Sequence, residues 1–191
     1  MFKNKSELAF LGTAWLNISP QNEMVDLKFG TYNPGRQTQE DLVRFMAEKM
    51  NLGECNSESN PLVIAVEAAK TSSESLVTGP SDRNQPSAFR QVEFNTRTSV
   101  PLELLAGMHR VKAARLASGY LTLRLKKLKR TIDKPRKHSK EQIEDQLIDA
   151  IKEEIAAVTR TIELVERWPV RFYDIGGVQS HPPNHLESRL T

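Results

Sequence analysis

The sequence predicts a small α/β (α+β) fold, in which a small mixed sheet has helices packed against it. Three observations support this prediction: short apolar or alternating segments recur, segments with helical spacing lie between them, and a long amphipathic stretch precedes a final alternating segment. The 191 residues suffice for one hydrophobic core. We therefore predict one domain over residues 1–175, with a disordered tail at 176–191.

The first predicted strand and helix lie between residues 24 and 50. MVDLKF, residues 24–29, alternates apolar and polar side chains, as a half-buried strand does. Residues 30–38 supply glycines and Asn-Pro for a turn, and Thr38 with Asp41 forms an imperfect capping box for a helix. The apolar face predicted for that helix consists of Leu42, Phe45, Met46 and Met50.

The middle of the chain contains two predicted strands around a long polar segment. PLVIAVEAA, residues 61–69, is typical of a strand buried on both faces. Residues 70–98 are poor in apolar side chains, and we interpret them as an insertion without a legible role. SVPLELLAG, residues 99–107, returns to strand character, and a helix is expected from residue 109 onward.

A basic and acidic helical extension is expected at residues 124–166. Nine of the seventeen residues from 124 to 140 are Lys or Arg, whereas the helix predicted at 141–166 carries eight acidic residues. The two charged segments can complement each other, or the basic segment can meet phosphates. An apolar stripe runs along the 141–166 helix at Ile143, Leu147, Ile151, Ile155, Val158, Ile162 and Val165. RWPVRFYDI, residues 167–175, predicts a final strand near a sheet edge.

Composition narrows the class of protein. The formal net charge is +3, which by itself does not indicate a nucleic-acid partner. A single cysteine, Cys55, excludes an internal disulfide and a cysteine-rich zinc site. No segment approaches the roughly 20 apolar residues that span a bilayer. We expect an intracellular protein, cytoplasmic or nuclear, without a membrane partner and without a metal site.

The most informative stretch joins the strand at 99–107 to the helix that follows. Gly107 allows the backbone to approach a ligand closely, and the free amides at a helix start attract anions. Arg110 can hold a phosphate with two hydrogen bonds, and His109 can donate or accept a proton near neutral pH. These residue types in this order indicate a phosphate-bearing ligand.

LAGMHRVKAARL, residues 105–116, resembles the box of glycine, His or Arg, and Arg, with an alanine-rich helix after it, of the ParB/sulfiredoxin superfamily. Upstream, Asn-Pro and an arginine after the first strand, then a helix, a loop with glycine and a second strand led by proline, are similar to the ParB pattern. The resemblance covers residues 25–116 without the segment at 70–98.

The resemblance implies a nucleoside triphosphate, ATP or CTP with magnesium, as the ligand. It implies that Gly107, His109 and Arg110 lie at this nucleotide. Asn33 and Arg36 would then lie across the same cleft, with Arg36 as a second phosphate ligand.

Some residues depart from the pattern of the superfamily. Met108 stands where sulfiredoxins have the catalytic cysteine and ParB proteins a glutamate, and Ala106 stands where related free serine kinases have an acid. Sulfinic acid reduction is therefore not expected, and whether the chain is an enzyme stays open. Glu67, Glu103 and His109 are candidate acid–base groups, although each glutamate is better explained as a solvent-facing or ion-paired strand residue.

The sequence therefore favours binding of a nucleoside triphosphate or another phosphate-bearing ligand, with phosphoryl transfer or hydrolysis left open. One alternative is a non-catalytic module that keeps the fold and engages a protein through the 141–166 helix. Another is a non-specific nucleic-acid binder that uses residues 124–140, although no helix-turn-helix follows the box.

Overall fold

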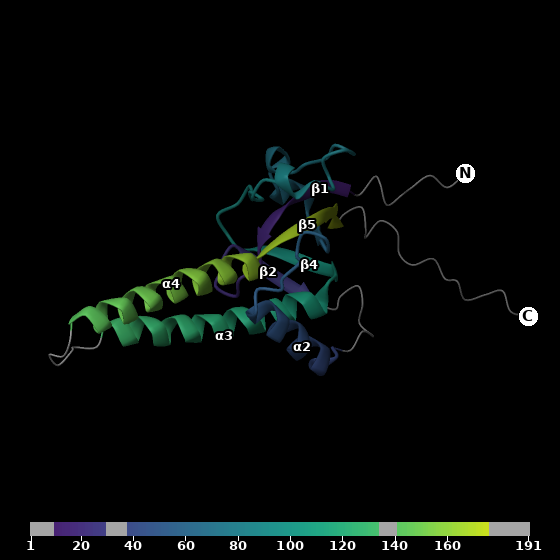
Figure 1. Ribbon diagram of the computed structural model, residues 1–191. Coiled ribbons are helices and arrows are strands. Elements are labelled where there is room, and N and C mark those ends of the chain that lie inside the picture. The colour runs from purple at the N-terminus through teal and green to yellow at the C-terminus, as the bar shows by residue number, and fades with distance from the viewer. Residues whose placement is uncertain (1–9, 30–37, 134–140, 176–191) are drawn as a thin grey trace, which may run out of the picture. The chain divides into compact units, whose positions relative to one another are not determined.

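The computed structural model describes residues 10–29, 38–133 and 141–175 (Figure 1). The contacts within the chain divide these residues into two compact units. The first consists of residues 10–29, 58–108 and 168–175 and contains the sheet. The second consists of residues 38–57, 109–133 and 141–167 and contains the helices.

The first unit is built on a mixed sheet of five strands in the order β1-β5-β3-β4-β2. Its strands are β1 (Phe10–Asn17), β2 (Val25–Phe29), β3 (Leu62–Val66), β4 (Val100–Ala106) and β5 (Arg167–Asp174). β4 pairs parallel with β2 and antiparallel with β3, and β3 pairs parallel with β5. The predicted α/β fold with a small mixed sheet is therefore confirmed.

The strands predicted near residues 25, 63, 104 and 170 are all present. β3 is the central strand, and Leu62, Ile64 and Val66 are fully buried, as its continuous apolar run predicts. β5 lies next to the edge strand β1, in agreement with a position near an edge. Pro169 precedes the first residue of β5 that pairs with β3, so its missing N–H costs no hydrogen bond to that neighbour.

The edge strand β1 is absent from the strands that the sequence predicts. Its outer side is covered by the segment between residues 70 and 98, which contributes to the fold. Thr13 exchanges two backbone hydrogen bonds of 2.9 Å with Val77, and the Trp15 backbone bonds to Arg90 and Val92 at 2.8 Å. An exposed strand edge is a template for aggregation. The segment interpreted as an insertion therefore caps the sheet.

The second unit consists of α2 (Glu40–Asn51), α3 (Met108–Ile132) and α4 (Glu141–Glu166). The helix predicted at 141–166 has the expected bounds. α3 and α4 run antiparallel, side by side (Figure 1), and Ser118 on α3 hydrogen-bonds the Glu166 carboxylate on α4. None of the helices in the described ranges has an apolar stretch long enough to cross a membrane.

The predicted details of α2 are wrong in two respects. Gln39, rather than Thr38, is the N-cap, and no side chain caps the helix. The Thr38 hydroxyl is engaged elsewhere, as an acceptor for Lys112. The buried face consists of Val43, Ala47 and Met50, whereas Leu42 and Phe45 of the predicted face are exposed.

Candidate functional site

Gly107 lies between β4 and α3, where the sequence predicts a tight junction. Its φ of 106° is in the region that residues with a side chain rarely adopt. The conformation lets α3 begin at Met108, directly after the strand. The first turn of α3 contains no acidic residue, so no side-chain carboxylate of its own opposes an anion at its amides.

The first turn of α3 contacts the residues just before α2, and both belong to the second unit. The Gln39 N–H donates to His109 Nε2 at 3.1 Å. Lys112 Nζ donates to Thr38 Oγ1 at 2.6 Å. Because Nε2 accepts a hydrogen bond, the neutral imidazole carries its proton on Nδ1. His109 and Lys112 therefore hold the starts of α2 and α3 together.

Arg110 is half-buried on α3. Desolvation by burial lowers the pKa of its guanidinium, which nevertheless stays charged because an arginine pKa lies far above neutrality. A partly desolvated guanidinium holds an anion more strongly than one in bulk water. Arg110 therefore keeps its charge in a partly desolvated position, where it also makes an interaction within the protein.

Asn33 and Arg36, the two residues predicted across the cleft, lie outside the described residues. The two residues that follow this stretch, Thr38 and Gln39, are described. These are the two residues held by Lys112 and His109. The structure thus connects the end of the predicted Asn-Pro and Arg segment to the first turn of α3.

The two candidate glutamates occupy different environments. Glu67 follows β3 and forms an exposed ion pair of 3.2 Å with Lys70, in agreement with the ion-paired position expected from the sequence. Glu103 lies in β4 and is only 5% exposed, so it is not solvent-facing. It makes interactions within the protein and stands opposite Ala65 and Lys28 in the sheet register. Neither residue is identified as a base.

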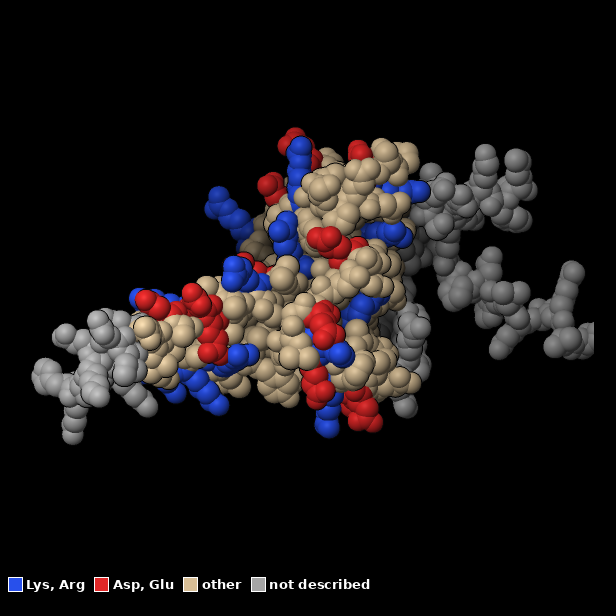
Figure 2. Space-filling model, in the orientation of Figure 1, with Lys and Arg blue, Asp and Glu red and all other residues tan. Residues whose placement is uncertain are grey.

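The basic and acidic segments meet at one described ion pair. Arg124 on α3 donates to the Glu154 carboxylate at 2.7 and 3.0 Å. Figure 2 shows acidic side chains gathered over α4 and basic side chains along the α3 edge. Both partners are about half exposed, so the pair adds little stability. Among the described side chains, the Arg124–Glu154 pair is therefore the ion pair that joins α3 to α4.

Burial raises the pKa of the Cys55 thiol, and a smaller opposing effect comes from a hydrogen bond with the Ser57 backbone. The thiol is therefore less nucleophilic at neutral pH than a free cysteine. The residues that the structure describes contain no group of three or more His, Cys, Asp and Glu placed to hold a metal ion. His138, His181 and His185 lie outside those residues.

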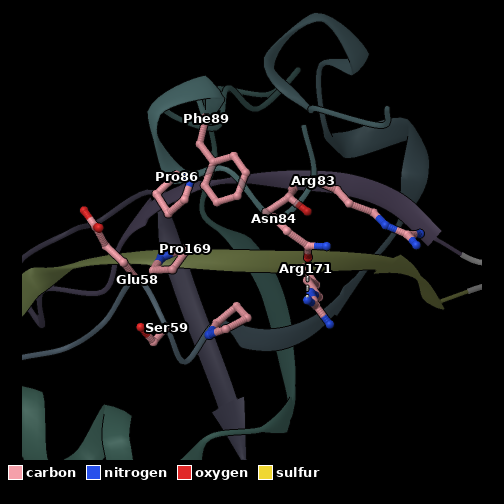
Figure 3. Close-up of a pocket in the computed structure, with 10 residues that line it drawn as sticks. Glu58, Ser59, Arg83, Asn84, Pro86, Phe89, Pro169 and Arg171 are labelled. Carbon is pink, nitrogen blue, oxygen red and sulfur yellow. Dashed lines mark hydrogen bonds between the residues drawn. The ribbon is translucent and has the colours of Figure 1, made fainter. Parts of the chain in front are cut away.

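A pocket of about 180 Å³ in the first unit is a candidate site that the sequence interpretation misses. Figure 3 shows it between β5 and the segment that caps β1. Ten residues line it: Thr13, Glu58, Ser59, Pro61, Arg83, Asn84, Pro86, Phe89, Pro169 and Arg171. They come from four separated stretches of the chain, so no local sequence motif predicts the pocket.

Thr13 is the least expected residue of this pocket. Its side chain is buried, and its hydroxyl oxygen has no hydrogen-bond partner. Its backbone N–H and carbonyl are both bonded to Val77, so only the hydroxyl is left unpaired. A buried hydroxyl without a partner costs about 1–3 kcal/mol. Natural proteins carry few such groups, and a ligand that supplies the missing partner is one explanation.

No protein-family model matches the chain, and searches of curated proteins and of solved structures find no match.

Proposed function

We propose that the chain binds a nucleoside triphosphate, with magnesium, or another phosphate-bearing ligand at the first turn of α3. One observation carries the proposal: His109 and Lys112 hold Gln39 and Thr38 at this turn. Those two residues end the segment that contains Asn33 and Arg36. The two halves of the resemblance to the ParB/sulfiredoxin superfamily are thereby linked through hydrogen bonds.

The chemistry of the turn favours an anion. The amides at the start of α3 carry partial positive charge, and Arg110 adds a full one that its half-buried position leaves less screened. Gly107 before the helix has no side chain to obstruct a phosphate. Glu40 and Asp41 in the first turn of α2 repel a bare triphosphate. A magnesium ion carried by the nucleotide offsets that repulsion, and carboxylates are ligands that magnesium accepts.

The proposal concerns binding and assigns no reaction. Glu67 is ion-paired and Glu103 is buried among protein partners. Met108 and Ala106 stand at the positions where the superfamily carries its reactive groups. Phosphoryl transfer would require a base or nucleophile that none of these residues supplies.

Isothermal titration of ATP, CTP and GTP with magnesium tests the proposal. We expect the wild type to bind at least one nucleotide and Arg110→Ala to weaken that affinity about 10- to 100-fold, because a charge-assisted contact is lost. Arg160→Ala removes the same charge from an exposed position on α4 and should leave the affinity unchanged. Circular dichroism verifies that Arg110→Ala is folded.

Two results would contradict the proposal. If none of the three nucleotides binds the wild type, the chain is not a triphosphate-binding protein of this kind. If a nucleotide binds Arg110→Ala and the wild type equally well, the assigned position is wrong.

A second candidate function, non-specific nucleic-acid binding, is favoured by the exposed cationic edge of α3. Four side chains on this edge are exposed and have no described carboxylate partner: Lys126, Lys127, Lys129 and Arg130. We expect duplex DNA affinity, measured by fluorescence anisotropy, to fall linearly with salt on a double-logarithmic plot. Lys126→Gln with Lys127→Gln should reduce the slope by about 2, since each phosphate contact contributes about 0.9. An unchanged slope would exclude this edge of α3 as the surface that contacts the DNA phosphates.

A further inference from the structure

The pocket of the first unit combines buried walls with a polar rim. Thr13 and Pro169 are buried, and Phe89 and Pro86 are half-buried, whereas Arg83 at the rim is exposed. Figure 3 shows the Phe89 ring and the Pro86 ring facing β5 across the hollow. The edge-to-face contact between Phe89 and Trp15, with centroids 5.9 Å apart, holds the Phe89 ring in place. The apolar part of the pocket is therefore preformed.

The cationic groups of the pocket lie at one end. Arg83 and Arg171 flank Asn84 in Figure 3, whereas Glu58 lies at the opposite end. Arg171 Nη2 donates to Asn84 Oδ1 at 3.0 Å, which fixes the guanidinium and leaves its other N–H groups available. Within the described ranges, neither arginine forms an ion pair with a carboxylate. This end of the pocket therefore carries uncompensated positive charge.

The Thr13 hydroxyl is an independent indication of a ligand. Thr13 lines the same pocket, and its hydroxyl oxygen is buried and lacks a hydrogen-bond partner. A hydroxyl in this state can donate to an anionic oxygen. A cavity of about 150 Å³ holds a benzene ring. The pocket, at about 180 Å³, therefore has room for a molecule with one ring or a short aliphatic body.

We propose that this pocket binds a small organic anion, with its charged group at Arg171 and Arg83, a hydrogen bond from Thr13, and its apolar body against Phe89. The site uses none of the residues at the first turn of α3. It is therefore separate from the proposed nucleotide site, and each can fail without the other.

Titrations followed by two-dimensional ¹H–¹⁵N NMR test this proposal with four probes: benzoate, phenyl phosphate, inorganic phosphate and benzyl alcohol. Benzoate or phenyl phosphate should shift the amide signals of Thr13, Asn84 and Phe89 in a saturable way. Inorganic phosphate and benzyl alcohol should bind at least 10-fold more weakly, since the first lacks the apolar ring and the second lacks the negative charge. The stronger of the first two identifies carboxylate or phosphate as the charged group.

Variants separate the contributions. Arg171→Met and Arg83→Met should each weaken the affinity for the best probe about 10-fold, and Thr13→Val about 5-fold. Thr13→Val should not lower the thermal midpoint of the free protein, because it removes a hydroxyl that has no partner. Arg97→Met removes a charge from an exposed position of the same unit, outside the pocket, and should leave the affinity unchanged.

Three results would overturn the proposal. The first is the absence of saturable shifts at these amides with either organic anion. The second is equal affinity for benzyl alcohol and benzoate, which would indicate an apolar cavity without anion recognition. The third is unchanged affinity in both Arg83→Met and Thr13→Val, whose substitutions lie at the rim and at an unpaired hydroxyl and should leave the fold intact.

Discussion

Gly12→Ala is expected to lower the free energy of unfolding by about 2–4 kcal/mol, because it combines backbone strain with a steric clash. Gly12 lies in β1 with a φ of 146°, which residues with a side chain rarely adopt. A Cβ there would lie 2.7 Å from Leu76 Cβ and 3.2 Å from the Val77 carbonyl oxygen. Both atoms belong to the segment that caps β1, so the substitution pushes the cap away from the edge.

Urea denaturation measures this effect, with Gly119→Ala as the matched control. Gly119 is exposed on α3, and apart from its chain neighbours and the adjacent helix backbone no atom lies within 4 Å of the position that a Cβ would take. Alanine is the better helix former, so Gly119→Ala should raise the free energy of unfolding by about 0.5–1 kcal/mol. If Gly12→Ala proves neutral, the close approach of residues 76 and 77 to β1 is incorrect.

Phe172→Ala should lower the free energy of unfolding by about 3–5 kcal/mol, the usual cost of deleting a fully buried aromatic ring. Phe172 lies in β5, is 0% exposed, and stands opposite Ile64 of the central strand. The surrounding strands cannot close the cavity without breaking their register. The measurement is again denaturant unfolding, followed by tryptophan fluorescence.

The neighbouring residue provides the control for Phe172. Tyr173 points to the other face of β5, is half-buried, and makes an edge contact with Phe10 at a centroid distance of 5.5 Å. Tyr173→Ala should cost about 1–2 kcal/mol, because less apolar area and one aromatic contact are lost. Equal effects of the two substitutions would contradict the assignment of Phe172 to the buried face.

The sequence predicts best those elements whose signal is local. The stripe along α4 repeats at helical spacing over its whole length, which locates the helix. The same stripe does not predict how deeply each residue is buried, since Val158 and Val165 are buried while Leu147 is exposed. On α2 two apolar stripes overlap, and the one with the larger side chains is not the buried one, because neighbouring elements decide which face is covered.

Features that depend on distant parts of the chain are not predictable in this way. β1 contains Gly12 and Ala14, which weaken a strand pattern, and the segment that satisfies its outer edge lies some sixty residues later. The pocket is not predictable for the same reason, since Thr13, Arg83 and Arg171 come together only in the folded protein. At the start of α3, by contrast, adjacent residues supply the chemistry, so the sequence alone identifies Gly107, His109 and Arg110 as candidates.

The strand order also constrains how the protein is made. Among the described strands, β5 is the last to be synthesised, yet it lies between β1, the first of them, and β3. α4 ends at Glu166 and β5 begins at Arg167, so the second helix of the hairpin runs directly into the strand without a connecting loop. During synthesis β1 can pair only with its cap, and the sheet closes when the last strand arrives. Contacts of such long sequence separation slow folding, so a chain shortened before residue 167 should expose two strand edges and aggregate.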